Sequence, residues 1–193
     1  GDLDTPVEPG IVSGGGAGDA VADGGAAASD LDPGELVARA TERATARVES
    51  LLEHDDGRNH AEIRSEVQTS MTEHVNVFRE EGGLKQALRD IREAREDYED
   101  VGVADQSRTF NTDLLHTIET RNIIDLAEAI TLAALAREEF RGAHWRKEHQ
   151  SRNDEEWLKH TLLSWNGGSP ELWFKPVILE GEEKRYEPKI RSY

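Results

Sequence analysis

The longest helical pattern in the sequence, from Phe110 to about Arg141, constrains the fold most. Its apolar residues recur every three or four positions, which is the period of an α-helix that buries one face. The residues in this pattern are Leu114, Leu115, Ile118, Ile123, Leu126, Ala127, Ile130, Ala133, Ala134 and Ala136. Because several of these side chains are small, another helix can approach closely. We therefore expect this segment to be the central helix of a bundle.

Three further helical patterns precede the long one. The first begins at Asp32, which can cap a helix with Pro33 in its first turn, and it extends to about Glu53. The second runs from about His60 to Phe78, and we expect Gly82 and Gly83 to end it. The third begins at Leu84 and reaches Tyr98.

These helices are expected to bury one apolar stripe each. The predicted core positions are Leu36, Ala40, Ala44, Val48, Leu51, Ile63, Val67, Met71, His74 or Val75, Phe78, Leu84, Leu88, Ile91 and Tyr98. Helical patterns separated by short glycine turns are typical of an antiparallel bundle. The predicted fold class is therefore mainly α, with three to four helices in residues 35–143.

A small β-hairpin is expected in residues 144–193. Gly142 is expected to end the long helix, because glycine accepts the left-handed conformation that terminates helices. Residues 157–165 and 172–179 have strand-like composition, and residues 166–170 make a turn between them. Pro176 restricts the second strand to an edge or splits it. We expect Trp157, Trp165 and Trp173 to form one packed face, and the chain to end in an extended segment.

Residues 1–34 are rich in glycine, alanine and aspartate and hold too few apolar residues to offset the entropy of ordering. We expect a flexible N-terminal segment that can include one short helix over residues 17–28, with a phosphate site as the alternative. The glycines of residues 14–18 suggest a dinucleotide-binding motif, G-x-G-x-x-G. The register fails, because Asp19 or Val21 stands at the third glycine position, and only two strand-like residues precede the motif.

The composition excludes several classes of function. The chain has 40 acidic and 23 basic residues, a net charge of −17, which argues against binding nucleic acid or anionic membranes. The acidic excess, with few lysines, is what we expect of a protein from a halophile, where salt screens the repulsion between like charges. An ordinary acidic surface is the alternative. Without cysteine the chain holds no disulfide, thiolate zinc site or cysteine-bound iron–sulfur cluster.

No apolar run approaches the roughly 18 residues that span a bilayer, and no secretory signal is visible. Since the chain does not begin with methionine, we expect it to be a piece of a longer protein.

Arginine, histidine and tryptophan are concentrated in residues 139–161. Arg141, His144 and Arg146 could support a flavin or a neighbouring domain, since arginine binds carboxylates bidentately and histidine titrates near neutrality. Alternatively, Arg141 satisfies helix-end carbonyls or pairs with Glu139 or Asp154, while His144 packs at the turn. Catalysis by these residues is the weakest of the three interpretations, and we expect no catalytic residue here.

Neither a metal site nor a hydrolase site is expected. His54 and His60, and likewise His144, His149 and His160, lack a compact ligand spacing, and the nearby acidic residues fit a solvated loop. No serine stands in a G-x-S-x-G motif.

Four sequence blocks resemble the flavoprotein subunit of succinate dehydrogenase and fumarate reductase. Residues 71–79 are similar to its M-x-x-x-x-x-V-F-R helix, and residues 110–112 to the F-N-T segment before its long helix. Residues 139–161 follow its E-S-R-G-A-H-x-R…R-D-D-x-x-W-x-x-H-T pattern, and residues 188–193 its P-K-I-R-x-Y ending. Phe140, Gln150 and Asn153 depart from this pattern. The resemblance covers about residues 35–193.

The resemblance implies an enzyme that oxidises succinate to fumarate, or the reverse, with FAD, and that passes electrons to an iron–sulfur subunit. In the family the FAD-binding fold and the capping domain precede the matched region. We therefore expect a C-terminal helical domain that braces those two domains, binds no FAD or metal itself and meets the membrane only through partner subunits. This places it in the cytoplasm, at the inner face of the membrane. The alternatives are a stand-alone acidic interaction domain and the equivalent domain of an L-aspartate oxidase, which shares the R-G-x-H step.

Overall fold

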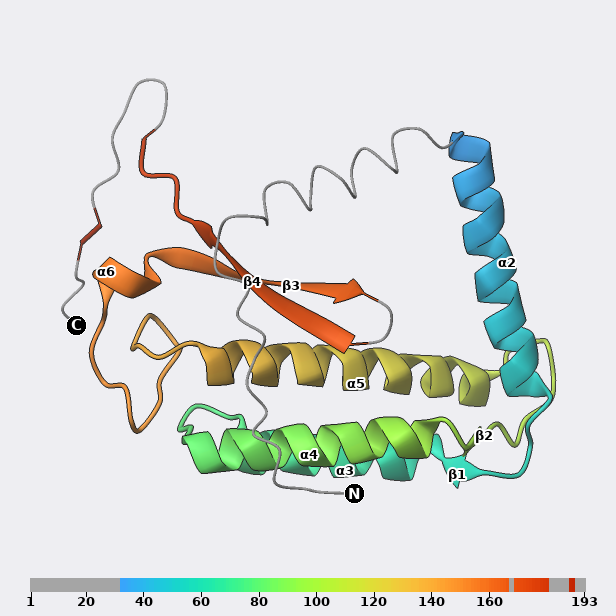
Figure 1. The fold of residues 1–193 in the computed structure, drawn as a ribbon. Coiled ribbons are helices and arrows are strands. Elements are labelled where there is room, and N and C mark those ends of the chain that lie inside the picture. Colours follow the sequence, from blue (N-terminus) through green and yellow to red (C-terminus); the bar gives the residue numbers. More distant parts are fainter. Residues whose placement is uncertain (1–31, 167–168, 181–187, 190–193) are drawn as a thin grey trace, which may run out of the picture.

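A computed structural model describes residues 32–166, 169–180, 188 and 189. Helices α3 (His60–His74), α4 (Glu81–Tyr98) and α5 (Thr112–Ala136) pack side by side, with α4 antiparallel to both others (Figure 1). The prediction of a mainly helical bundle is therefore confirmed. The predicted N-terminal segment, except for its last residues from Asp32 on, and most of the predicted extended tail lie outside the described residues.

The core lies between these three helices. Its fully buried aliphatic side chains include Ile63 of α3, Leu84 and Ile91 of α4, and Ile124 of α5. Burying one such side chain contributes about 1.5–3 kcal/mol relative to leaving it exposed. The Tyr98 hydroxyl satisfies its polar end by donating to a backbone carbonyl of α5, 2.9 Å away.

Side-chain caps fix where the helices begin. Asn59 precedes α3 and its side chain accepts from the Ala61 amide, while Asn111 accepts from the Leu114 amide at the start of α5. Such caps satisfy amides that lack a partner within the helix. Strands β1 (Arg58–Asn59) and β2 (Val101–Gly102) pair in parallel at this end of the bundle.

The structure corrects the predicted end of the second helix. α3 ends at His74, and Gly82 and Gly83 lie in the first turn of α4 rather than in a terminating turn. Near a helix start, glycine costs little because few intrahelical bonds depend on it. Phe78, predicted to be in the core, is 80% exposed and contacts Trp145 edge to face, with ring centroids 5.4 Å apart.

The apolar stripe of α5 was predicted too broadly. The helix ends at Ala136, before Gly142, and Leu115, Leu126 and Ile130 are about half exposed or more. With 100° between successive residues these three lie on one face, opposite the buried Ile124. The predicted apolar stripe had therefore included residues from both the buried and the exposed face of α5.

Helix α2 (Pro33–Leu52) forms as predicted, with the Asp32 side chain capping it, but it does not join the bundle. None of its residues is buried; of its predicted core stripe, Leu36 is 39% exposed, and only Leu51 at its base packs against the core. Figure 1 shows α2 rising steeply from one end of the bundle.

Strands β3 (Lys159–Asn166) and β4 (Ser169–Pro176) form the predicted antiparallel hairpin. The predicted bounds were wrong: Ser169 and Pro170, predicted in the turn, pair within β4, and β4 ends at Pro176 rather than reaching residue 179. The hairpin lies over α5, where Leu172 packs with Leu88 and Leu132. The prediction of one tryptophan face is wrong. Trp157 lies in the short helix α6 (Asp154–Trp157), and the strand register puts Trp165 and Trp173 on opposite faces of the hairpin.

Candidate functional site

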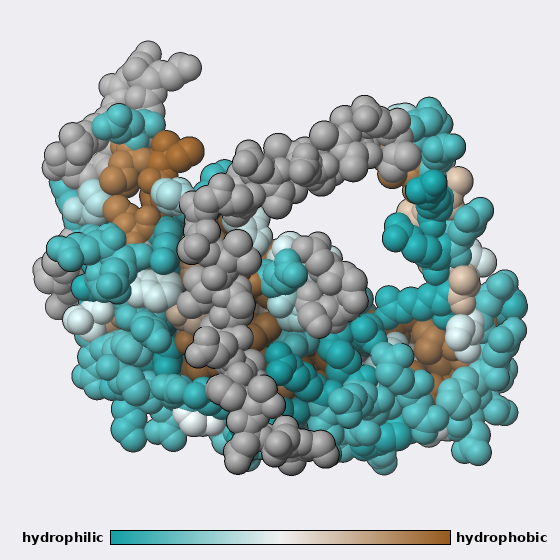
Figure 2. Space-filling view, in the orientation of Figure 1, coloured by the Kyte–Doolittle hydropathy of each residue, from teal (hydrophilic) through white to brown (hydrophobic). Residues whose placement is uncertain are grey.

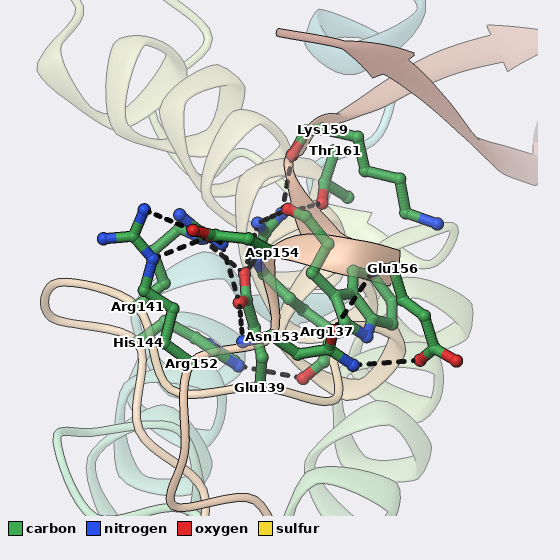
Figure 3. Close-up of polar contacts among 11 residues, drawn as sticks. Arg137, Glu139, Arg141, His144, Arg152, Asn153, Asp154, Glu156, Lys159 and Thr161 are labelled. Atoms are coloured by element: carbon green, nitrogen blue, oxygen red, sulfur yellow. Dashed lines mark hydrogen bonds and ion pairs between the residues drawn. The ribbon is translucent and has the colours of Figure 1, made fainter. Parts of the chain in front are cut away.

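Two arginines and one backbone amide within residues 137–161 donate to the carboxylate of Glu139. Its side chain is fully buried and accepts hydrogen bonds from Arg137 at 2.5 and 2.9 Å and from Arg141 at 2.6 and 3.0 Å. The backbone amide of Asn153 donates to it as well, at 3.1 Å. Figure 3 shows these groups and their neighbours, which we call the Glu139 cluster: Arg137, Glu139, Arg141, Asn153 and Asp154.

Two opposing effects set the pKa of Glu139. Burial acts to raise it, because a buried carboxylate loses its hydration. The hydrogen bonds from Arg141, the Asn153 amide and Arg137 outweigh burial and bring the pKa below its ordinary value. The buried group is therefore a carboxylate, and its charge is compensated by two guanidinium groups.

Arg137 connects the bundle to the hairpin. Besides Glu139, its guanidinium donates to the carbonyl oxygens of Trp157 at 2.7 Å and Lys159 at 3.0 Å, and to the Thr161 hydroxyl. It also lies over the Trp157 ring, 5.4 Å from the centroid. One side chain at the end of α5 therefore fixes the start of β3.

Asp154 extends the cluster to the surface. It accepts from Arg141 at 2.6 Å and from Arg152 at 2.7 Å through both oxygens. These hydrogen bonds, first from Arg152 and then from Arg141, lower the pKa of Asp154 to about 2. The alternative in which Arg141 pairs with Glu139 or Asp154 is the observed one, because Arg141 pairs with both.

His144 has both ring nitrogens engaged. Nε2 lies 2.9 Å from the Arg137 carbonyl oxygen and Nδ1 lies 3.2 Å from a guanidinium nitrogen of Arg79. Since arginine only donates, Nδ1 must accept and Nε2 must carry the proton. Burial lowers the pKa of His144, and the charges of Arg79, Arg137 and Arg146 lower it further. His144 is therefore a neutral bridge at the turn.

Arg146 satisfies the end of α5. Its side chain is 1% exposed and donates to the Leu135 carbonyl at 2.7 Å. Carbonyls in the last helical turn lack intrahelical partners and carry partial negative charge, so a buried cation is stabilising there. The sequence analysis offered, as an alternative, an arginine that donates to carbonyls at the end of the long helix. Such an arginine exists, but it is Arg146 and not Arg141.

The turn between Arg141 and His144 aims these side chains. The two residues exchange backbone hydrogen bonds of 3.0 and 3.1 Å, and Gly142 between them has φ 61°. That conformation costs other residues about 1–2 kcal/mol. Glycine is therefore required at position 142 by the backbone and not by crowding, because an added Cβ would meet nothing within 4 Å.

Of the three predicted candidates, Arg141 and His144 are half-buried and Arg146 is buried, and the Arg141 side chain is 27% exposed. His144 and Arg146 are committed to partners within this chain. Sequence reasoning missed Arg137 and Arg79, which complete the arrangement. Arg79 belonged to the V-F-R block and Arg137 to the end of the apolar pattern, and no local spacing connected either residue to His144.

No group of three potential ligands lies close enough to hold a metal ion among the described residues. Two larger clefts, of about 450 and 430 Å³, open elsewhere on the bundle. The second is lined by five carboxylates, those of Glu66, Glu73, Asp90, Glu93 and Asp97, which would repel a pyrophosphate. The first has no glycine-rich phosphate cradle of the kind that dinucleotide cofactors require. Neither of these two clefts therefore fits FAD.

A family model described as "Fumarate reductase flavoprotein C-term" matches residues 64–193. This chain belongs to that family. The resemblance found in the sequence is confirmed for this flavoprotein C-terminal family, which is shared by succinate dehydrogenases and fumarate reductases. The halophilic source stays a prediction.

Relatives of the flavoprotein family are similar over most of this chain. The fumarate reductase flavoprotein subunit of Haemophilus influenzae is 36% identical over 149 residues, 77% of this chain and 24% of that protein. The succinate dehydrogenase flavoprotein subunit of Rickettsia conorii is 41% identical over 120 residues, 62% of this chain and 20% of that protein. The chain spans about a quarter or less of the length of these relatives.

Solved structures agree. An E. coli quinol fumarate reductase chain superposes with a TM-score of 0.71 and 32% identity, over 83% of this chain and 28% of that one. An adenylylsulfate reductase from Archaeoglobus fulgidus has a TM-score of 0.61 at 19% identity, which is a likeness of fold alone. No described helix is both long enough and apolar enough to cross a membrane.

Proposed function

We propose that this chain is the C-terminal helical domain of a flavoprotein subunit that interconverts succinate and fumarate with FAD and passes electrons to an iron–sulfur subunit. The observation that carries the proposal is the combined match in sequence and fold to fumarate reductase and succinate dehydrogenase flavoprotein subunits, over most of this chain and about a quarter of theirs. FAD, when bound by the preceding part, supplies the redox chemistry.

The part proposed for this chain is structural support. The Glu139 cluster joins the end of α5 to the hairpin. Most hydrogen-bonding groups of the cluster bind other groups of this chain. The Arg141 side chain is 27% exposed, and through this exposed part it can contact a neighbouring FAD-binding or capping domain. In this proposal none of Arg141, His144 and Arg146 touches the substrate.

Partners and location follow from the same proposal. The iron–sulfur subunit binds the assembled flavoprotein, and the complex sits at the cytoplasmic face of the membrane through other subunits. The large acidic excess of this chain keeps it from contacting anionic lipid headgroups directly.

The test is to express the complete polypeptide of which this chain is part and to measure bound FAD and succinate-dependent reduction of an artificial electron acceptor. We expect stoichiometric flavin and activity in the complete subunit, and neither in the 193-residue chain alone. A complete polypeptide that ends up without flavin and without a dinucleotide-binding glycine motif would instead favour a stand-alone acidic domain.

The complete polypeptide also distinguishes the proposed enzyme from an L-aspartate oxidase. An L-aspartate oxidase would reduce its flavin with aspartate and make hydrogen peroxide in air, whereas the proposed enzyme would reduce it with succinate. Aspartate-dependent peroxide without succinate-dependent dye reduction would reject the proposed substrate and leave the flavoprotein family in place.

A further inference from the structure

Helix α2 exposes an apolar stripe that nothing in the described chain covers. Leu36, Ala40, Ala44 and Val48 follow one another at intervals of four residues, which places them along one side of the helix. Leu36, Ala40 and Ala44 are exposed and Val48 is half-buried. At 100° per residue the acidic Glu35, Glu42 and Glu49 lie on the opposite side, whereas the arginines of α2 lie beside the stripe or, for Arg47, on it near the base. This is the pattern of a helix with one buried face, without anything to bury it.

The stripe is continuous with the core at its base. Leu51 continues the same side of α2 and packs against the bundle core, and it also lines the 450 Å³ cleft together with Arg47 of α2, Tyr98 of α4 and Arg121 of α5. Figure 2 shows hydrophobic surface between the base of α2 and the bundle, beside a mostly hydrophilic face. The anchored base therefore holds the rest of the stripe at a set angle to the bundle.

An amphipathic helix of this length gains little stability by itself, since isolated helices are marginal in water and most helical stability comes from packing of the apolar face. α2 has 20 residues and buries none of them completely. Packing of its apolar side against a partner would therefore stabilise α2.

The position of α2 in the chain favours one partner. The family match begins at residue 64, after α2, and carries the description of a C-terminal region. Relatives have about three quarters of their length outside the matched part. A domain that precedes the C-terminal region is attached through the N-terminal end of α2, and this attachment keeps it at high effective concentration beside the stripe.

We propose that the apolar stripe of α2 is the docking face for the preceding, flavin-binding part of the same polypeptide, which covers Leu36, Ala40 and Ala44 with apolar side chains of its own. This inference rests on the proposed function for the existence of that part. It adds the surface by which the two parts meet. The occupant is neither a second copy of this chain nor the iron–sulfur subunit.

Two pairs of substitutions with equal composition and charge test the docking face. The stripe pair is Ala40→Glu with Ala44→Glu, and the control pair is Ala38→Glu with Ala46→Glu on the opposite side of α2. All four alanines are exposed in the described chain, and glutamate forms helices well, so neither pair should unfold the 193-residue chain.

The readout is trypsin cleavage within α2, at Arg39, Arg43 and Arg47, followed over time in the 193-residue chain and in the complete subunit. Cleavage requires local opening of the helix, and docking opposes that opening. We expect cleavage at least ten times slower in the complete wild-type subunit than in the 193-residue chain. The stripe pair should abolish this protection, and the control pair should keep it.

Each other outcome overturns the inference. Protection that is equal for both pairs, or absent in the wild-type subunit, means that the stripe is not the docking face. Protection that appears only after the iron–sulfur subunit is added assigns the stripe to that partner. A dimer of the 193-residue chain that the stripe pair dissociates assigns it to a second copy.

The proposed function is judged separately on the same preparation. Flavin content and succinate-dependent dye reduction of the wild-type subunit decide it, whatever the trypsin result. A subunit that is active and yet unprotected in α2 rejects only the docking inference.

Discussion

The two ends of the bundle use opposite chemistry. At the end where α5 meets the hairpin, charged side chains are buried: Glu139 is 0% and Arg146 1% exposed. At the end that carries α2, apolar side chains are exposed, with Leu36 at 39% and Val37 at 66%. Buried charges are retained in proteins only where partners compensate them, and exposed apolar stripes mark surfaces that bind something. The stretch rich in arginine and histidine therefore connects the bundle to the hairpin through buried charges, and we call this connection, made by the Glu139 cluster with His144 and Arg146, the internal joint. Helix α2, in contrast, carries an exposed apolar surface.

Removing the buried carboxylate gives the largest expected effect. Glu139→Ala leaves Arg137 and Arg141 without their shared partner, and breaking a buried ion pair costs about 3–5 kcal/mol. Chemical denaturation followed by circular dichroism measures the loss. Glu138→Ala, one residue away and exposed, is the matched control and should change the free energy of unfolding by less than about 0.5 kcal/mol. Equal effects of the two substitutions would contradict the internal joint.

A pair of leucines compares the core with α2. Leu84→Ala, at a fully buried position in α4, should lower the free energy of unfolding by about 2–5 kcal/mol. Leu36→Ala, on the stripe of α2, should change it by less than about 0.5 kcal/mol in the 193-residue chain. Denaturation curves of both variants check this. A large loss at Leu36 would mean that α2 is already covered.

The sequence predicted local structure better than it predicted packing. The helices and the hairpin were predictable because local period and turn residues determine them, as for α2 with its Asp32 cap and for the antiparallel pairing of β3 with β4. Packing was predictable only where a pattern had one apolar face, as in α4. It failed for Phe78 and for α2, because an apolar stripe shows that a face is to be buried without showing which partner buries it.

The site was predictable in location but not in roles. The density of residues 139–161 and the family pattern pointed to Arg141, His144 and Arg146, yet Arg137 and Arg79 complete the arrangement from other elements. Glu139 was expected only as a pairing partner for Arg141. Its place at the centre depends on contacts with Asn153 across a loop, and no local period encodes them.

Two glycines should respond in opposite directions to the same substitution. Gly142→Ala, at φ 61° in the loop beside the Glu139 cluster, should destabilise by about 1 kcal/mol. Gly82→Ala, in the first turn of α4 with no atom near the added Cβ, should stabilise only slightly, by about 0.4 kcal/mol. Thermal unfolding monitored by circular dichroism measures both. A loss of stability in Gly82→Ala would instead support the glycine turn that the sequence predicted there.

Lowering the pH should reduce the free energy of unfolding through protonation of His144, and this is the smallest of the expected effects. Its pKa in the folded chain is lowered from 6.5, so its contribution is present above that pH and is lost as the pH falls below it. A proton on Nδ1 would face Arg79, with Arg137 and Arg146 also near. Between pH 7.5 and pH 6 the loss should be less than about 1 kcal/mol.

His144→Gln should remove this part of the pH dependence, and His160→Gln, at an exposed position, should leave it unchanged. Unfolding free energies of the three proteins at both pH values give the comparison. A pH dependence that survives in His144→Gln would assign it to other groups.

The most direct measurement of the joint uses Arg141→Ala in the complete subunit, with FAD content, thermal stability and steady-state kinetics of succinate oxidation determined on one preparation. Arg141 bridges Glu139 and Asp154, so we predict lower stability and less assembled, flavin-loaded subunit. We also predict that kcat per bound flavin and KM stay close to the wild-type values. A subunit with normal stability and flavin content but a large loss of kcat would contradict the account.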